Sequence, residues 1–129
     1  MLVYATGYKV TFPFFKEDFF NVEQTNDLQL YRRVVHPDFS GLYFVGLVQP
    51  LGAVMPLAET QAIWIARLLR GECRLPDRAT MLRSINEEAA KNRRRYKQSS
   101  DRLSPRHTLQ VDFYPYKQSL EREMKAMRV

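Results

Sequence analysis

The chain has one cysteine, Cys73, among its 129 residues, and this scarcity excludes several kinds of protein. A single cysteine cannot form an internal disulfide and does not provide a set of metal ligands. No apolar run reaches the roughly 20 residues needed to cross a bilayer, and the first residues lack the basic start of a signal peptide. We therefore expect no membrane association and a reducing compartment, the cytoplasm.

The sequence also lacks the common self-contained catalytic motifs. It contains no Gly-x-Gly-x-x-Gly, no phosphate-binding lysine loop, no His-Glu-x-x-His and no Gly-x-Ser-x-Gly. No Ser, Cys or second His lies at a useful spacing from His36, which is predicted to be a loop histidine, and no neighbour would activate Cys73. The residues predict no catalytic side chain, so any redox chemistry would need a cofactor.

The second half of the chain has no acidic excess, and all of the basic excess lies there. Residues 1–60 hold 4 Lys or Arg against 6 Asp or Glu, a net −2, and residues 61–129 hold 16 against 8, a net +8. A basic surface suits acidic partners, and Arg93–Arg95 leaves a nucleic-acid-binding domain open as one hypothesis. The interpretation we favour is a solvated helical surface without nucleic acid, because no nucleic-acid-binding motif accompanies the charge.

What is present is organised around Leu42–Gly71. Leu42–Val48 is rich in Val, Phe and Tyr and predicts a buried strand. A loop with Pro50 and Gly52 follows, and Pro56 then predicts the first turn of a helix that ends at Gly71. That helix is apolar almost all round, which predicts burial within a larger body. A loop joining a strand to a helix start is typical of a site for a negatively polarised group.

The remaining elements are predicted from turn and periodicity signals. Before the central segment we expect a buried strand at Leu2–Tyr4, a mostly buried phenylalanine cluster at Phe12–Phe20, and an antiparallel excursion over residues 21–41 that turns at Asn26-Asp27. After it we expect a helix over Arg78–Gln98 with Asp77 as its N-cap, an extended piece at His107–Asp112, and a helix over Tyr114–Met127.

Several groups of residues, in order and with matching spacing, resemble the flavin-containing monooxygenases. They are Ala5-Thr6-Gly7-Tyr8, Phe12-Pro13-Phe14, the run from Gly46 to Pro56, Glu59-x-Gln61-Ala62-x-Trp64, and Arg106 to Gln110 with Asp112. The resemblance covers essentially the whole chain, and it is to the C-terminal segment of the family only. It implies an α/β fold, the C-terminal portion of a flavoprotein with two Rossmann-like dinucleotide-binding domains, ending in helices.

The resemblance also implies cofactors and a chemistry. These enzymes use NADPH to reduce FAD, oxygen adds to the flavin at C4a, and the hydroperoxyflavin oxygenates a soft nitrogen or sulfur nucleophile of a small substrate. On this basis residues 1–71 are the C-terminal part of the FAD-binding domain and residues 72–129 are a helical extension. Both glycine-rich motifs, for FAD and for NADPH, are absent. The segment is therefore expected to be inactive without the missing N-terminal segment.

Two groups of cofactor-binding residues follow from the same resemblance. The turn that lies beside the cofactors in the family corresponds here to Thr6, Gly7 and Tyr8. The loop that approaches the flavin ring corresponds to Gln49, Pro50, Leu51 and Gly52. A competing hypothesis, from a different class, is a non-catalytic truncated paralogue that binds a protein partner.

One position departs from the family's pattern. The family usually has Arg where this chain has Ile63, and an arginine there would form an i,i+4 pair with Glu59. Because Ile63 cannot form that pair, we expect it to pack under the C-terminal segment.

Overall fold

The named secondary-structure elements of the described residues are four helices and one two-stranded sheet. The computed structural model describes residues 1–6, 10–16, 19, 28–97 and 105–126. The helices are α1 (Met55–Leu69), α2 (Arg78–Lys97), α3 (Pro105–Leu109) and α4 (Phe113–Ala126). Strands β1 (Gln49–Pro50) and β2 (Gln110–Val111) pair in parallel, with Gln49 opposite Gln110.

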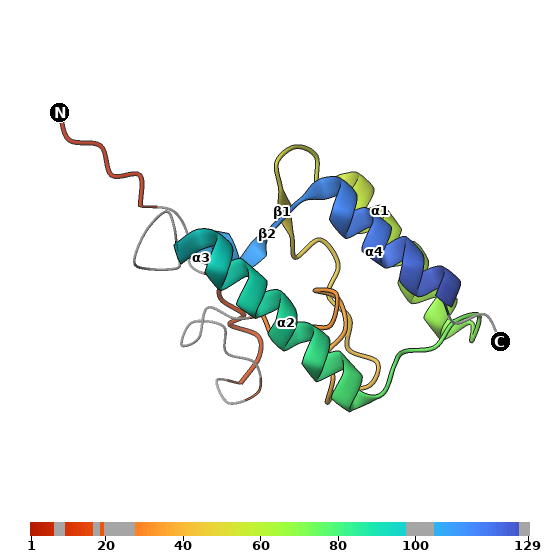
Figure 1. Ribbon diagram of the computed structural model, residues 1–129. Coiled ribbons are helices and arrows are strands. Elements are labelled where there is room, and N and C mark those ends of the chain that lie inside the picture. Colours follow the sequence, from red (N-terminus) through yellow and green to blue (C-terminus); the bar gives the residue numbers. More distant parts are fainter. Residues whose placement is uncertain (7–9, 17–18, 20–27, 98–104, 127–129) are drawn as a thin grey trace.

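The core forms where α1 and α4 lie side by side, as Figure 1 shows. Leu57 and Trp64 point inward from α1, and Tyr116 and Leu120 point inward from α4. Leu57 and Trp64 lie seven positions apart, and Tyr116 and Leu120 lie four apart. Residues at these spacings share one face of a helix. The core continues into segments on either side of the helices through Tyr31, Val34, Val35, Val48, Cys73, Met81, Ile85 and Val111.

Both predicted ends of the helix after the loop, and the predicted start of the next helix, are confirmed. Pro56 lies in the first turn of α1, and Gly71 follows its C-cap with a φ of +71°. The Asp77 side chain accepts a 2.8 Å hydrogen bond from the Thr80 backbone N–H, so it caps α2 as predicted. The last helix begins one residue earlier than predicted, at Phe113.

The predicted strand at Leu42–Val48 is wrong in extent. The structure gives only a single antiparallel bridge between Tyr43 and Val35, and a 2.8 Å hydrogen bond from the Phe44 N–H to the Val34 carbonyl. A strand needs backbone partners along its length. Among the described residues, the bridge and that hydrogen bond both pair the segment with the Tyr31–Val35 turn.

Three further expectations need correction. Leu2–Tyr4 is exposed and not a strand, since no described strand lies beside it. His107–Leu109 is helical, and only Gln110–Val111 is extended. The phenylalanine cluster was expected to be mostly buried, but Phe14 is 75% exposed. Its rings still contact one another, and the ring centroids of Phe12 and Phe14 lie 6.0 Å apart. The predicted Asn26-Asp27 turn lies outside the described residues.

The outer face of α1 is exposed, contrary to the expected burial all round. It carries Met55, Ile63 and Leu69, because α4 covers only the opposite side of the helix. Ile63 is 45% exposed, so the prediction that it packs under the C-terminal segment is wrong. Among the described residues, no helix has the length and apolarity to span a membrane.

Candidate flavin-facing site

The candidate site is the loop from Gly46 to Gly52, which connects the Tyr43 bridge to α1. Its backbone turns at both ends through left-handed conformations, with φ of +78° at Gly46 and +114° at Gly52. Side chains other than glycine rarely adopt such angles. Pairing of β1 with β2 holds the middle of the loop, so Pro50 is buried while Gln49 is exposed.

The tip of the loop presents a surface suited to a flat group with a polar edge. Leu51 is 81% exposed and Met55 lies close by in sequence with its side chain also exposed. A Cβ added to Gly52 would meet nothing within 4 Å, so there is open space at the backbone. The Gln49 amide supplies both a donor and an acceptor beside this apolar surface. An isoalloxazine ring is such a flat group with a polar edge, and its contact with the loop stays a prediction.

The start of α1 faces the same loop without neutralising side chains. Val54 occupies the N-cap position and makes no side-chain hydrogen bond, and the first turn contains no acidic residue. The partial positive charge of the helix start is thus not offset locally. That property agrees with the predicted preference for a negatively polarised group.

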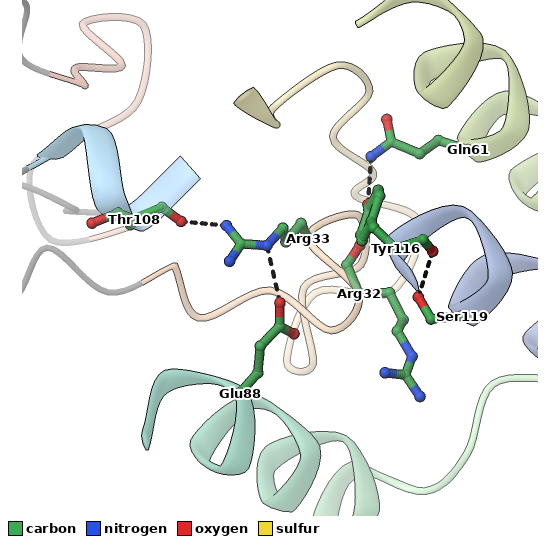
Figure 2. Close-up of polar contacts among 7 residues, drawn as sticks. All are labelled: Arg32, Arg33, Gln61, Glu88, Thr108, Tyr116 and Ser119. Carbon is green, nitrogen blue, oxygen red and sulfur yellow. Dashed lines mark hydrogen bonds and ion pairs between the residues drawn. The ribbon is translucent and has the colours of Figure 1, made fainter. Parts of the chain in front are cut away.

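Beneath the loop lies a buried polar chain that the motifs did not predict (Figure 2). Gln61 accepts a 2.7 Å hydrogen bond from the Gly46 N–H. It donates one of 2.7 Å to the Tyr116 hydroxyl, which Figure 2 shows. Tyr116 donates in turn to the Arg32 carbonyl at 2.7 Å. Burial raises the pKa of the Tyr116 hydroxyl, which keeps it a donor. Two sequence signals point to Gln61: its place in the Glu59-x-Gln61-Ala62-x-Trp64 motif, and its polar side chain midway between Leu57 and Trp64 on the buried face.

Arg33 joins the same region to α2 and α3. Its Nε lies 3.0 Å from Glu88 Oε1, and its Nη1 donates to the Thr108 carbonyl. The Arg33 side chain is buried, so the guanidinium is enclosed by these partners. It thus holds the Tyr31–Val35 turn against both helices.

The two groups of predicted cofactor residues have different outcomes. Gln49, Pro50, Leu51 and Gly52 lie together at the loop. The segment of residues 1–6, to which Thr6 belongs, extends away from α1 and β1 in Figure 1. Gly7 and Tyr8 lie outside the described residues, so the contact predicted for this turn remains a prediction.

The other chemically reactive residues are held in ordinary structural roles. His36 accepts a 3.1 Å hydrogen bond from the Asp38 N–H, and burial lowers its pKa. Burial raises the pKa of the Cys73 thiol, which opposes activation. Arg95 pairs with Asp112 at 2.5 Å. Among the described ranges, no group of three His, Cys, Asp or Glu is placed to bind a metal.

Comparison with known proteins identifies the class of protein to which this fold belongs. A profile of the flavin-binding monooxygenase-like family matches residues 1–127, so the chain belongs to that family. The structure of S-allyl-L-cysteine S-oxygenase from Allium sativum resembles it with a TM-score of 0.67 and 27% identity, covering 96% of this chain and 28% of that one. The predicted family and fold class are thereby confirmed.

Individual relatives are closer in sequence. Flavin-containing monooxygenase 2 from Homo sapiens is 35% identical over 128 residues, which are 98% of this chain and 23% of that protein. Flavin-containing monooxygenase 5 from Rattus norvegicus is 37% identical over 115 residues, which are 88% of this chain and 20% of that protein. The chain thus spans about a quarter of the length of the curated relatives that it matches.

Proposed function

We propose that this chain forms the flavin-facing C-terminal part of an FAD- and NADPH-dependent monooxygenase that oxygenates soft nitrogen or sulfur nucleophiles. The family match over residues 1–127 is the observation that carries the proposal. Names of relatives support both nucleophiles: one from Pan troglodytes is an N-oxide-forming dimethylaniline monooxygenase, and the Allium sativum enzyme is an S-oxygenase.

The loop residues have separate roles toward the cofactor in this proposal. When bound, FAD supplies the electron transfer between NADPH and oxygen. Gln49 hydrogen-bonds the polar edge of the flavin, and Pro50 fixes the loop backbone against β2. Leu51 and Met55 exclude water from the ring, and Gly52 leaves room for its close approach. Thr6, Gly7 and Tyr8 form a second contact near the two nucleotides.

The chain alone is proposed not to turn over. Its 129 residues contain neither glycine-rich nucleotide-binding motif, so FAD and NADPH would be held mainly by a segment that these residues do not include. The loop would then contribute one wall of a site shared with that segment.

A chimera tests this function. The matching segment of human flavin-containing monooxygenase 2 is replaced by this chain, and the purified protein is examined for flavin absorbance and NADPH oxidation. We expect a yellow protein that oxidises NADPH. Gly52→Val is expected to abolish FAD retention, because its side chain enters the space assigned to the ring.

Gly41→Val is the matched control for that substitution. Gly41 also has a positive φ, +86°, and open space at its Cβ, but it lies outside the loop. It should cost backbone strain without loss of FAD. A folded but colourless chimera, or full FAD retention in Gly52→Val, contradicts the proposal.

A second candidate is favoured by one observation. The exposed apolar face of α1, with Met55, Ile63 and Leu69, suits a non-catalytic paralogue that binds a protein partner. This candidate predicts that the chimera folds and binds no flavin. The same measurement therefore separates the two functions.

A further inference from the structure

Gln61 is a polar side chain placed where an apolar one would be expected. It lies on the inner face of α1 and is 0% exposed. A buried amide without partners is costly, so its hydrogen bonds account for its presence there. The Oε1 atom accepts from the Gly46 N–H and the Nε2 atom donates to the Tyr116 hydroxyl, both at 2.7 Å.

The direction of this chain of hydrogen bonds is fixed by its two ends. The Gly46 N–H can only donate, and the Arg32 carbonyl can only accept. Between them, the Gln61 amide and the Tyr116 hydroxyl each accept one bond and donate one. Donors aligned in one direction polarise one another, so the three bonds strengthen as a set. Neither intermediate group can reverse without breaking bonds at both sides.

The series of hydrogen bonds reaches the loop at Gly46, where it can fix the direction of the loop backbone. Gly46 is the first loop residue and has a φ of +78°, where the backbone turns toward β1. Pairing of β1 with β2 holds Gln49 and Pro50. β2 supports the loop directly from the C-terminal part of the polypeptide, and Gln61 of α1, which supports Gly46, is itself bonded to Tyr116 of α4.

We propose that Gln61 is a positioning residue that transmits the placement of α4 to the Gly46–Gly52 loop, and so sets where the loop stands relative to the flavin. The last clause rests on the proposed function, whereas the coupling of α4 to the loop does not. Gln61 itself touches no cofactor. Its role is to fix the backbone from which Gln49 projects.

Hydrogen exchange of the Gly46 amide tests the coupling in the complete 129-residue chain. Gln61→Met keeps the side-chain length and removes both hydrogen bonds. Exchange at Gly46 is expected to accelerate about tenfold, the effect of losing one net hydrogen bond. The Leu82 amide in α2 reports general opening and should change much less. Equal acceleration at both amides would mean a merely structural role and would overturn the proposal.

Two further variants sharpen this test. Thr60→Val is the matched control, because Thr60 is also buried in α1 but its hydroxyl donates to the Pro56 carbonyl within the same helix, at 2.8 Å. It should leave exchange at Gly46 unchanged. Tyr116→Phe keeps the packed ring and removes one partner of Gln61, so it should accelerate exchange at Gly46 by a few-fold. It carries the test if Gln61→Met does not fold.

The flavin absorption band of the chimera distinguishes failure of the coupling from failure of the function. Gln61→Met should shift that band, and Thr60→Val should not. Unchanged exchange at Gly46 in both Gln61→Met and Tyr116→Phe overturns the coupling. Accelerated exchange with an unmoved band overturns the placement of the loop against the flavin.

Discussion

Two adjacent arginines adopt left-handed backbone conformations at the centre of the molecule. Arg32 and Arg33 have φ of +50° and +58° and form a tight turn closed by a 3.1 Å bond from the Val34 N–H to the Tyr31 carbonyl. Each such residue costs roughly 1–2 kcal/mol. Glycine would avoid that cost but would lose the guanidinium contacts, which include a 2.9 Å pair between Arg32 and Glu123.

Tyr31, in the same turn as Arg32, also contacts Glu123. Its hydroxyl donates to Glu123 Oε1 at 2.7 Å, and burial, reinforced by that carboxylate, raises the pKa of the Tyr31 hydroxyl. The turn is therefore held to α4 by side chains from two of its residues. Contacts of this kind offset the backbone strain.

Arg33→Lys should destabilise the chain although it preserves the charge. An ammonium group cannot reproduce the fork that reaches Glu88 and the Thr108 carbonyl together. We expect a loss of about 1–2 kcal/mol in the free energy of unfolding, measured by urea denaturation.

Arg78→Lys is the control for Arg33→Lys. Arg78 pairs with Asp38 at 2.5 Å, but both side chains are largely exposed. Its substitution should leave the urea midpoint unchanged, because exposed pairs add little. Equal midpoints for Arg33→Lys and the unsubstituted chain would show that the buried fork is not needed.

At the scale of elements, α1 has two faces with different requirements. Its inner face is packed with Leu57 and Trp64, whereas Ile63 lies on the outer face between Glu59 and Arg67. Hydrophobicity alone does not distinguish these faces, because both carry an isoleucine: Ile63 on the outer face and Ile65 two positions later. Only Ile65 packs against the core.

Ile63→Arg should be tolerated and slightly stabilising. The new side chain would pair with Glu59 one turn earlier, worth about 0.2–0.5 kcal/mol, as circular dichroism during thermal unfolding would register. Ile65→Arg, the matched change on the core side, should lower stability by about 2 kcal/mol or more. If Ile63→Arg destabilised as much as Ile65→Arg, Ile63 would have to be buried after all.

At the scale of the whole molecule, one core joins the two predicted parts of the chain. Val48, Leu57 and Trp64 come from residues 1–71, and Tyr116 and Leu120 come from residues 72–129. Neither part keeps its apolar residues covered without the other. The boundary at residue 71 between an FAD-binding part and a helical extension stays a prediction.

The two parts should therefore fail to fold separately. We expect a peptide of residues 1–71 to show no cooperative thermal transition by circular dichroism. Mixing it with residues 72–129 should restore one, because α4 again covers α1. A cooperative transition in residues 1–71 alone would contradict a shared core.

Local sequence was sufficient for the ends of the helices and for the loop. Pro56, Gly71 and Asp77 act through their own backbone or a neighbour three residues away, so their effects need no distant partner. The loop after Val48 was predicted for a similar reason, because Gly52 adopts a conformation that other residues disfavour, whereas Gly46 was predicted within the preceding strand. The resemblance then assigned Gln49 and its neighbours to the flavin.

Contacts between residues far apart in the chain were decided only by the tertiary structure. The length of a strand depends on partners, which is why Leu42–Val48 is reduced to one bridge. The exposed face of α1 depends on where α4 lies. The bonds from Gly46 through Gln61 and Tyr116 to Arg32 join residues up to 84 positions apart. Local propensity carries no information about such distances, because a hydrogen bond requires two groups that only folding brings together.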